Sequence, residues 1–246
     1  DGDGMRRQRE TVWKAYGTGP AVLAGDALFA LAMQTLAETP GPHTAAAVRC
    51  LCETLAALVR GQAEDLLFEE RPWTGPGAVR TDEYRSMAER KTGSLLGCAA
   101  ALGGLLGGAP ARTVAALDRA GRHLGVAFQA VDDLLGAWGD PAVTGKPVHG
   151  DLRKRKKTYP VLAALARNDR VARELARLLN SPQPLDARAA SRAAELVEAA
   201  GGRAATLDEA RRHLDAARAC LDGVPLDPCA ARDIQALLAY LLHRTL

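Results

Sequence analysis

Two adjacent aspartates, Asp132 and Asp133, interrupt an otherwise apolar stretch of the chain. In a helix of about 100° per residue, one stripe of this stretch is wholly apolar, which predicts a buried face; its residues are Leu124, Phe128, Val131, Leu135 and Trp138. A second stripe contains no Lys, Arg or Glu, and consists of Gly125, Gln129, Asp132, Asp133 and Gly136. Two carboxylates among short side chains predict the floor of a groove that admits a bulky ligand. A merely exposed aspartate pair on a surface helix fits the same pattern.

Basic residues follow the aspartates and suggest what this ligand is. Lys146 is followed by a run of five cations at positions 153–157. Carboxylates repel phosphate directly, but they can hold Mg²⁺, or Mn²⁺, which bridges phosphate oxygens while Lys and Arg neutralise the remaining charge. The combination predicts a metal-dependent polyphosphate site, and the alternative is a solvated, charged turn. The segment GDPAVTGKP is not a P-loop, because Pro147 stands where Ser or Thr would bind the metal and a helix precedes it.

Composition and charge narrow the class of protein. The 246 residues are 48% hydrophobic and 25% charged, and the net charge is +3. So small a charge argues against nucleic acid or an anionic membrane as the main partner. The five cysteines form no CxxC pair, which is typical of reduced thiols in a cytoplasmic protein. The segment DGDGMRRQRE has no apolar core, so no signal peptide is predicted there.

The pattern along the chain predicts one all-α domain over residues 1–246. No segment of adequate length alternates apolar and polar residues with β-branched enrichment, so sheet content is expected to be almost nil. The uncharged run 94–111 is interrupted by glycines, which favours two closely packed core helices over a membrane span. Helices are expected at about 21–37, 44–70, 82–105, 112–138 and 157–167, with three short ones after Pro184.

Six segments together resemble the trans-isoprenyl (polyprenyl) diphosphate synthases, in family order and spacing. They are RRQRETVWKAYG, AVLAGDALFALA, GQAEDLLFE, YRSMAERKTGSLL, GVAFQAVDDLLGAWGDP and TGKPVHGDLRKRKKTYPVL. The resemblance runs from residue 1 to about 165 and weakens in the C-terminal helices. It implies an isoprenoid-synthase-type helical bundle around a central cavity, commonly a homodimer.

The resemblance also implies an activity. Members join isopentenyl diphosphate head to tail with an allylic diphosphate, giving geranyl, farnesyl or geranylgeranyl diphosphate-type products. By matching position, Asp132 would ligate Mg²⁺ with Asp133 in support, and Asp1 would face them from the first aspartate-rich motif. Thr92 and Gln129 would line the reacting carbons.

Matching positions assign the remaining substrate contacts in the same way. Lys91, Lys146 and Arg6 would bind the allylic diphosphate. Arg7 would bind isopentenyl diphosphate, and Lys156 would lie on the loop that closes the site.

The sequence departs from the family pattern in two places. Gly136 stands where many members carry the last aspartate of the second motif, so Asp140 is expected to substitute in part. Gly136→Asp is expected to be tolerated or mildly beneficial, because a glycine leaves space there. Asp1 matches the last aspartate of the first motif, so the N-terminal helices of the family domain are expected to be lacking from residues 1–246. We therefore expect these residues alone to show no chain elongation, and a chain that restores the upstream segment to be active.

Three alternatives remain beside an elongating transferase. Arg7 and Lys91 argue against a class I terpene cyclase, which ionises one diphosphate and needs no second substrate. Retention of Asp132, Lys91 and Lys146 argues against a non-catalytic subunit of a heteromeric synthase. No aromatic residue interleaves with the basic run, which argues against nucleic-acid binding.

Overall fold

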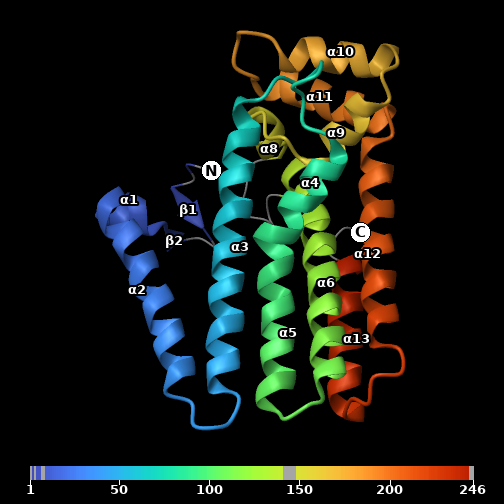
Figure 1. Cartoon of the computed structure of the whole chain (residues 1–246). Helices are drawn as coiled ribbons and strands as arrows, with labels where there is room; N and C mark the ends of the chain where they lie inside the picture. The colour runs from blue at the N-terminus through green and yellow to red at the C-terminus, as the bar shows by residue number, and fades with distance from the viewer. Residues whose placement is uncertain (1, 3, 7–8, 141–147, 244–246) are drawn as a thin grey trace.

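The chain folds into a bundle of long helices in the computed structural model, which describes residues 2, 4–6, 9–140 and 148–243 (Figure 1). The first half of the described chain contains β1 (Met5–Arg6), β2 (Arg9–Glu10), α1 (Val12–Tyr16), α2 (Thr18–Ala37), α3 (Thr44–Glu70), α4 (Thr81–Ala88), the π-helical turn η1 (Glu89–Gly93), α5 (Ser94–Leu106) and α6 (Ala111–Trp138). The second half contains α8 (Gly150–Arg153), α9 (Tyr159–Ala166), α10 (Arg170–Leu179), α11 (Ala187–Ala199), α12 (Gly202–Leu221) and α13 (Pro228–His243).

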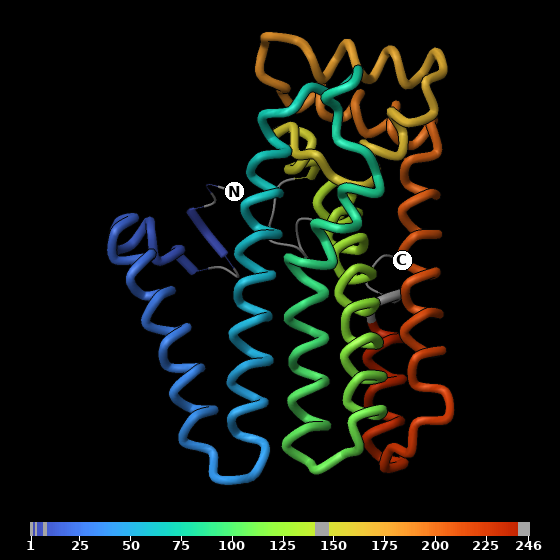
Figure 2. The backbone as a smooth tube through the Cα atoms, viewed as in Figure 1, coloured from blue at the N-terminus to red at the C-terminus, as the bar shows by residue number. Residues whose placement is uncertain are grey.

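Helix α6 lies at the centre of the bundle. It packs extensively against α5 on one side and against α12 on the other, and it also contacts η1 and α13. The tube view shows the long helices side by side and the shorter α10 and α11 gathered across one end (Figure 2). The N-terminal pair α1 and α2 lies at the opposite side of the bundle from α12 and contacts α3 (Figure 2).

The all-α prediction is confirmed. Within the described residues, strand structure is limited to the antiparallel pair β1 and β2, which joins Met5 to Glu10 and Arg6 to Arg9. The run 94–111 forms one helix, α5, rather than two, and after a turn Pro110 caps α6. Small side chains let α5 approach both α3 and α6.

Helix α10 was missed by the sequence analysis, although a signal for it exists. Asp169 caps its first turn by accepting a hydrogen bond from the backbone N–H of Ala172 at 2.9 Å. Asp186 caps α11 in the same way. An aspartate followed by an amphipathic run is a sequence-level helix start, so this element was predictable.

Two glycines set how closely the central helices approach. A Cβ on Gly125 of α6 would lie 2.4 Å from the Cα of Gly93 in η1, and a Cβ on Gly61 of α3 would lie 2.4 Å from the backbone nitrogen of Lys91. Since real Cβ atoms keep a longer distance, each helix can approach η1 this closely only without a side chain there. The turn that carries Lys91 is therefore held between α3 and α6.

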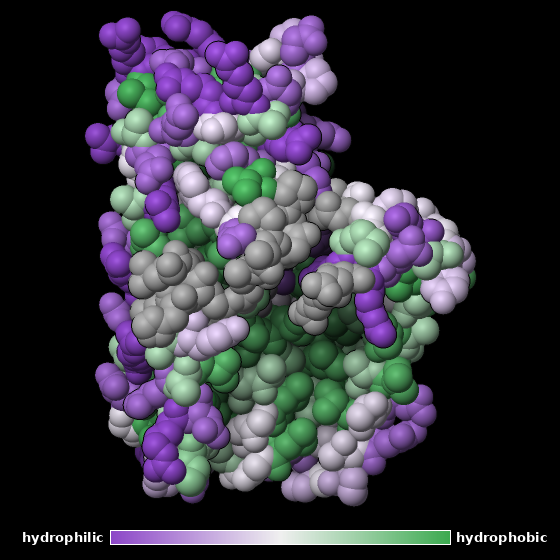
Figure 3. Space-filling model, turned by 180° about the vertical axis from the view of Figure 1, so that it is seen from behind, coloured by the Kyte–Doolittle hydropathy of each residue, from purple (hydrophilic) through white to green (hydrophobic). Residues whose placement is uncertain are grey.

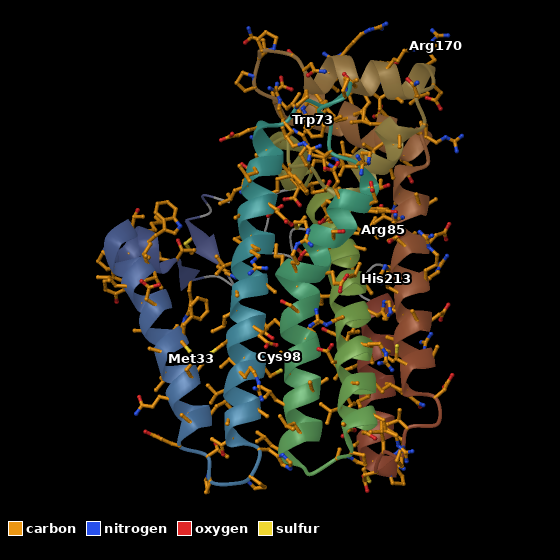
Figure 4. All side chains as sticks on the ribbon, in the orientation of Figure 1. Met33, Trp73, Arg85, Cys98, Arg170 and His213 are labelled. Carbon is orange, nitrogen blue, oxygen red and sulfur yellow. The ribbon has the colours of Figure 1, made fainter. Side chains whose placement is uncertain are left out.

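A polar network joins α12 to α4 and α9. Glu209 is 3% exposed and accepts hydrogen bonds from Arg85 at 2.5 and 3.0 Å and from the Tyr159 hydroxyl at 2.9 Å. Arg212 also donates to it, and His213 lies 3.3 Å away. Arg85 of α4 and His213 of α12 lie at this contact (Figure 4). Burial opposes ionisation, but hydrogen bonds from His213, Arg85 and Tyr159 prevail and hold the pKa of Glu209 well below its ordinary value of 4.5.

The Gly125 contact can be tested by adding one methyl group. Gly125→Ala should lower the free energy of unfolding by about 1–3 kcal/mol, because α6 and η1 must separate. Gly103→Ala in α5 is the matched control, since nothing lies within 4 Å of the added Cβ, and it should be neutral or stabilising. Chemical denaturation of both variants checks this; equal effects would contradict the packing argument.

The Glu209 network predicts a pH dependence of stability. A depressed folded-state pKa stabilises the fold above the unfolded pKa, and this stabilisation is lost as the pH falls below about 4.5. Glu209→Gln should lower the unfolding free energy at pH 7 by about 2 kcal/mol and flatten the acid side of the stability curve. Glu174→Gln is the control, because its ion pair with Arg192 is exposed and contributes little. Thermal melts between pH 3 and pH 8 measure both.

Candidate active site

Three elements, α3, η1 and α6, bring together several of the predicted site residues. Lys91 on η1 forms an ion pair with Asp65 on α3, with 2.5 Å between Nζ and Oδ2. The π-helical geometry of η1 interrupts the helix predicted at 82–105. Single π-helical turns occur often at functional sites, because the extra residue redirects the side chains around it.

Thr92 and Gln129 meet across the contact between η1 and α6. The Thr92 hydroxyl donates a hydrogen bond to Oε1 of Gln129 at 2.9 Å. The amide nitrogen of Gln129 in turn donates to Oδ1 of Asp133 at 3.1 Å. The structure therefore brings together two residues that the sequence analysis placed beside the reacting carbons; that role stays a prediction.

The two adjacent aspartates have opposite environments. Asp133 is 3% exposed, and its Oδ2 accepts hydrogen bonds from the Tyr84 hydroxyl at 2.5 Å and from the backbone N–H of Tyr159 at 2.8 Å. Asp132 is exposed and makes no hydrogen bond or ion pair with the residues that the structure describes. Of the pair, Asp132 has the carboxylate that is open to a ligand.

Burial and hydrogen bonding act in opposite directions on Asp133. Desolvation raises its pKa to about 7, although the donors Tyr84, Tyr159 and Gln129 act to lower it. The pKa of Tyr84 is also raised well above 10, first by burial and then by the charge of Asp133, with smaller contributions from Asp65 and Asp132. The carboxylates of α3 and α6 thus act on one buried phenol.

The second stripe of α6 was predicted to form the floor of a groove, and this prediction is wrong for most of its residues. Gly125 is packed against Gly93, and Asp133 and Gly136 are buried. The space beside Gly136 is filled by a carboxylate, because a Cβ there would lie 1.9 Å from Oδ2 of Asp151. The expected free space beside Gly136 is therefore absent, and Gly136→Asp requires the Asp151 side chain to move; its tolerance stays a prediction. Asp140, the expected substitute, is exposed beyond the end of α6.

The other predicted residues are more widely distributed. Arg6 is exposed on β1, and Lys156 is half-buried in the segment between α8 and α9. Asp1, Arg7 and Lys146 lie outside the described residues. Their predicted roles in metal and diphosphate binding are untested by the structure.

Lys157, the last cation of the basic run, is buried, which argues against the alternative of a wholly solvated turn. It is 7% exposed, and its ammonium lies 3.8 Å from the ring centroid of Trp73. Burial lowers its pKa to about 8. Trp73 lies at the end of the bundle near α8, α10 and α11 (Figure 4). A lysine that pairs with an aromatic face anchors the backbone that follows Lys156.

The donor chemistry fits Mg²⁺ only in part within the described chain. No group of three His, Cys, Asp or Glu side chains close enough to hold a metal occurs among the described residues. Asp132 nevertheless offers an oxygen ligand of the kind that Mg²⁺ prefers, with no partner among the residues that the structure describes. Mg²⁺ sites commonly take one or two carboxylates together with substrate phosphates.

A separate pocket of about 440 Å³ lies far from this site. It is formed where α6 begins and α12 ends, and Arg112, Arg119 and Asp222 are among its lining residues. About 20 residues of helix, or roughly 30 Å, separate Arg112 from Asp132 along α6. This pocket therefore does not coincide with the region of Asp132 and Asp133.

Comparison with known proteins identifies the class of fold and site. A family profile described as polyprenyl synthetase matches residues 1–197. The solved structure of polyprenyl synthetase from Streptomyces coelicolor A3(2) superposes with a TM-score of 0.88 at 42% identity, covering 98% of this chain and 72% of that one. The chain belongs to the polyprenyl synthetase family.

The chain is also similar to two named relatives within the family. The chain is 42% identical over 247 residues to (2E,6E)-farnesyl diphosphate synthase of Mycobacterium bovis, covering 99% of this chain and 67% of the relative. It is 48% identical over 203 residues to geranylgeranyl diphosphate synthase of Mycobacterium tuberculosis, covering 82% of this chain and 57% of the relative. The chain thus spans between about half and two thirds of the length of these relatives.

Proposed function

We propose that the protein is a prenyltransferase that condenses isopentenyl diphosphate head to tail with an allylic diphosphate. One observation carries the proposal: in a member of the polyprenyl synthetase family, Asp132 is exposed and unpaired among the described residues on the helix that also holds Gln129 against Thr92. The names of the relatives differ in product chain length, so the proposal extends to the reaction and not to one product.

Each residue has a distinct task in this reaction. Asp132 would hold Mg²⁺, which when bound neutralises charge on the departing diphosphate. Lys91 would bind a phosphate oxygen, and Asp65 orients its ammonium until substrate arrives. The side-chain oxygens of Thr92 and Gln129 would lie beside the carbons where positive charge develops, which favours the transition state. No observation favours the terpene cyclase or the non-catalytic subunit.

Asp132 provides the direct test. The full-length protein should condense isopentenyl diphosphate with at least one of a set of allylic diphosphates, in a reaction that requires Mg²⁺ or Mn²⁺. Asp132→Ala should lower turnover about a hundredfold to a thousandfold, because the metal loses a ligand where leaving-group charge develops. Asp208→Ala, an exposed position on α12, is the control. Turnover of Asp132→Ala within a few fold of wild type would remove Asp132 from the mechanism, and absence of condensation by wild type would overturn the function.

We also propose that the protein is a homodimer in which a second copy covers α2. None of the α2 residues is buried, and several of its large apolar side chains are exposed, with Leu23 68% and Leu28 65% exposed. Seen from behind, hydrophobic residues gather in the middle and right of the lower half of the molecule, bordered by polar residues (Figure 3). An apolar surface of this kind marks an interaction site. Helix α2 is also the one helix of the described chain that is long and apolar enough to cross a membrane.

A measurement of molecular mass tests whether α2 forms a dimer interface, and vesicle flotation tests whether it binds a membrane. The full-length protein should elute at twice its monomer mass in light scattering coupled to size exclusion, and Leu23→Glu should shift it toward monomer, because a charge would be buried at the interface. Arg177→Glu on α10, an exposed position outside this face, is the control. A monomeric wild type would contradict the dimer, and flotation with lipid vesicles would assign α2 to a membrane.

A further inference from the structure

Four side chains form a continuous hydrogen-bonded chain from the bundle interior to the candidate site. Tyr84 on α4 donates to Asp133, which accepts from Gln129, which accepts from Thr92. The three distances are 2.5, 3.1 and 2.9 Å.

The oxygens of Asp133 are almost fully used within the protein. Oδ2 takes the Tyr84 hydroxyl and the backbone N–H of Tyr159, and Oδ1 takes the amide of Gln129. A carboxylate oxygen accepts about two hydrogen bonds, so Oδ2 is saturated. Because the side chain is only 3% exposed, its three partners hold it in one rotamer. Asp133 is thus placed to orient other groups, whereas its neighbour Asp132 is open to a ligand.

Asp133 determines which end of the Gln129 amide faces the site. An ionised carboxylate only accepts hydrogen bonds, so in that form of Asp133 the Gln129 nitrogen points toward Asp133 and Oε1 points toward Thr92. The Thr92 hydroxyl then donates its hydrogen to Gln129, and the lone pairs of its oxygen remain free. If the amide rotated by half a turn, its nitrogen would donate to Thr92, and that oxygen would lose a lone pair.

We propose that Tyr84 is a positioning residue that acts through Asp133 to fix the orientation of Gln129 and Thr92. The phenol fixes the carboxylate, the carboxylate fixes the amide, and the amide leaves the Thr92 oxygen as an acceptor facing developing positive charge. The catalytic part of this inference rests on the proposed function. Tyr84 touches neither metal nor substrate in this scheme, so its loss should change the rate of reaction rather than substrate binding.

A pair of Tyr→Phe substitutions isolates this role. Tyr84→Phe removes a donor to Asp133. Tyr159→Phe removes the hydroxyl of a similarly buried tyrosine, which bonds Arg85 and Glu209, but it keeps the backbone N–H that Asp133 accepts. The two rings pack edge to face at 5.8 Å, so both variants keep similar packing. Both should lose thermal stability, which makes Tyr159→Phe a control for a purely structural effect.

The kinetic readout is the separation of kcat from KM. In the full-length protein, Tyr84→Phe should lower kcat about tenfold or more, because small misplacements of reacting groups are costly to rate. KM for both substrates and the affinity for Mn²⁺ should stay within about twofold of wild type. Tyr159→Phe should not show this fall in kcat. An unchanged kcat in Tyr84→Phe, or a weakened Mn²⁺ affinity, would overturn the proposal, the latter by placing Asp133 on the metal.

A second readout does not depend on turnover. In protein labelled with ¹⁵N-glutamine, the side-chain amide signal of Gln129 is assigned by its disappearance in Gln129→Glu. Tyr84→Phe should shift or broaden this signal in the absence of substrate, and Tyr159→Phe should not. An unmoved signal would overturn the positioning role even if condensation is found. If wild type shows no condensation but the signal responds as expected, the proposed function fails while the orienting contact stands.

Discussion

The buried carboxylate of Asp133 is the contact on which the candidate site depends. It joins three elements, because Tyr84 comes from α4, Asp133 from α6 and the donating N–H of Tyr159 from the start of α9. Removing a carboxylate from water is unfavourable, as its raised pKa of about 7 shows, and only several donors make it tolerable. The same donors fix the rotamer of Asp133. The buried carboxylate, although unfavourable in the core, therefore gives Gln129 a single orientation.

Close backbone packing places the second wall of the site against this helix. Glycines at 61 and 125 allow α3 and α6 to approach η1 to distances that a side chain would prevent. Lys91 and Thr92 are adjacent in sequence, but the π-helical turn presents Lys91 toward Asp65 on α3 and Thr92 toward Gln129 on α6. The close packing of α3 and α6 against η1 therefore also positions the polar groups of the site. The Glu209 network secures α12 and α9 from the other side.

Local patterns accounted for the helical fold and for several site residues. The apolar stripe of α6 is confirmed only in part as a buried face: Val131 is buried, whereas Leu124, Phe128, Leu135 and Trp138 are half-buried. The absence of alternating segments correctly predicted almost no sheet in the described residues. Family spacing selected Lys91, Thr92 and Gln129, which the structure gathers at the contact of α3, η1 and α6, and Asp132, which is exposed on α6. Tyr84 was missed, because its partner lies 49 residues away and no periodicity links them.

The sequence by itself determined the class of fold, the family and the identity of the charged groups, because helical periodicity and motif spacing are local properties of the chain. Only the tertiary structure decided which aspartate of the pair is exposed, since residues one apart on a helix face different neighbours. It also decided that the space beside Gly136 holds Asp151, and that Lys157 is buried on Trp73 rather than solvated. Burial and hydrogen-bond partners come from segments distant in sequence, and they alone distinguish a ligand-binding carboxylate from a positioning one.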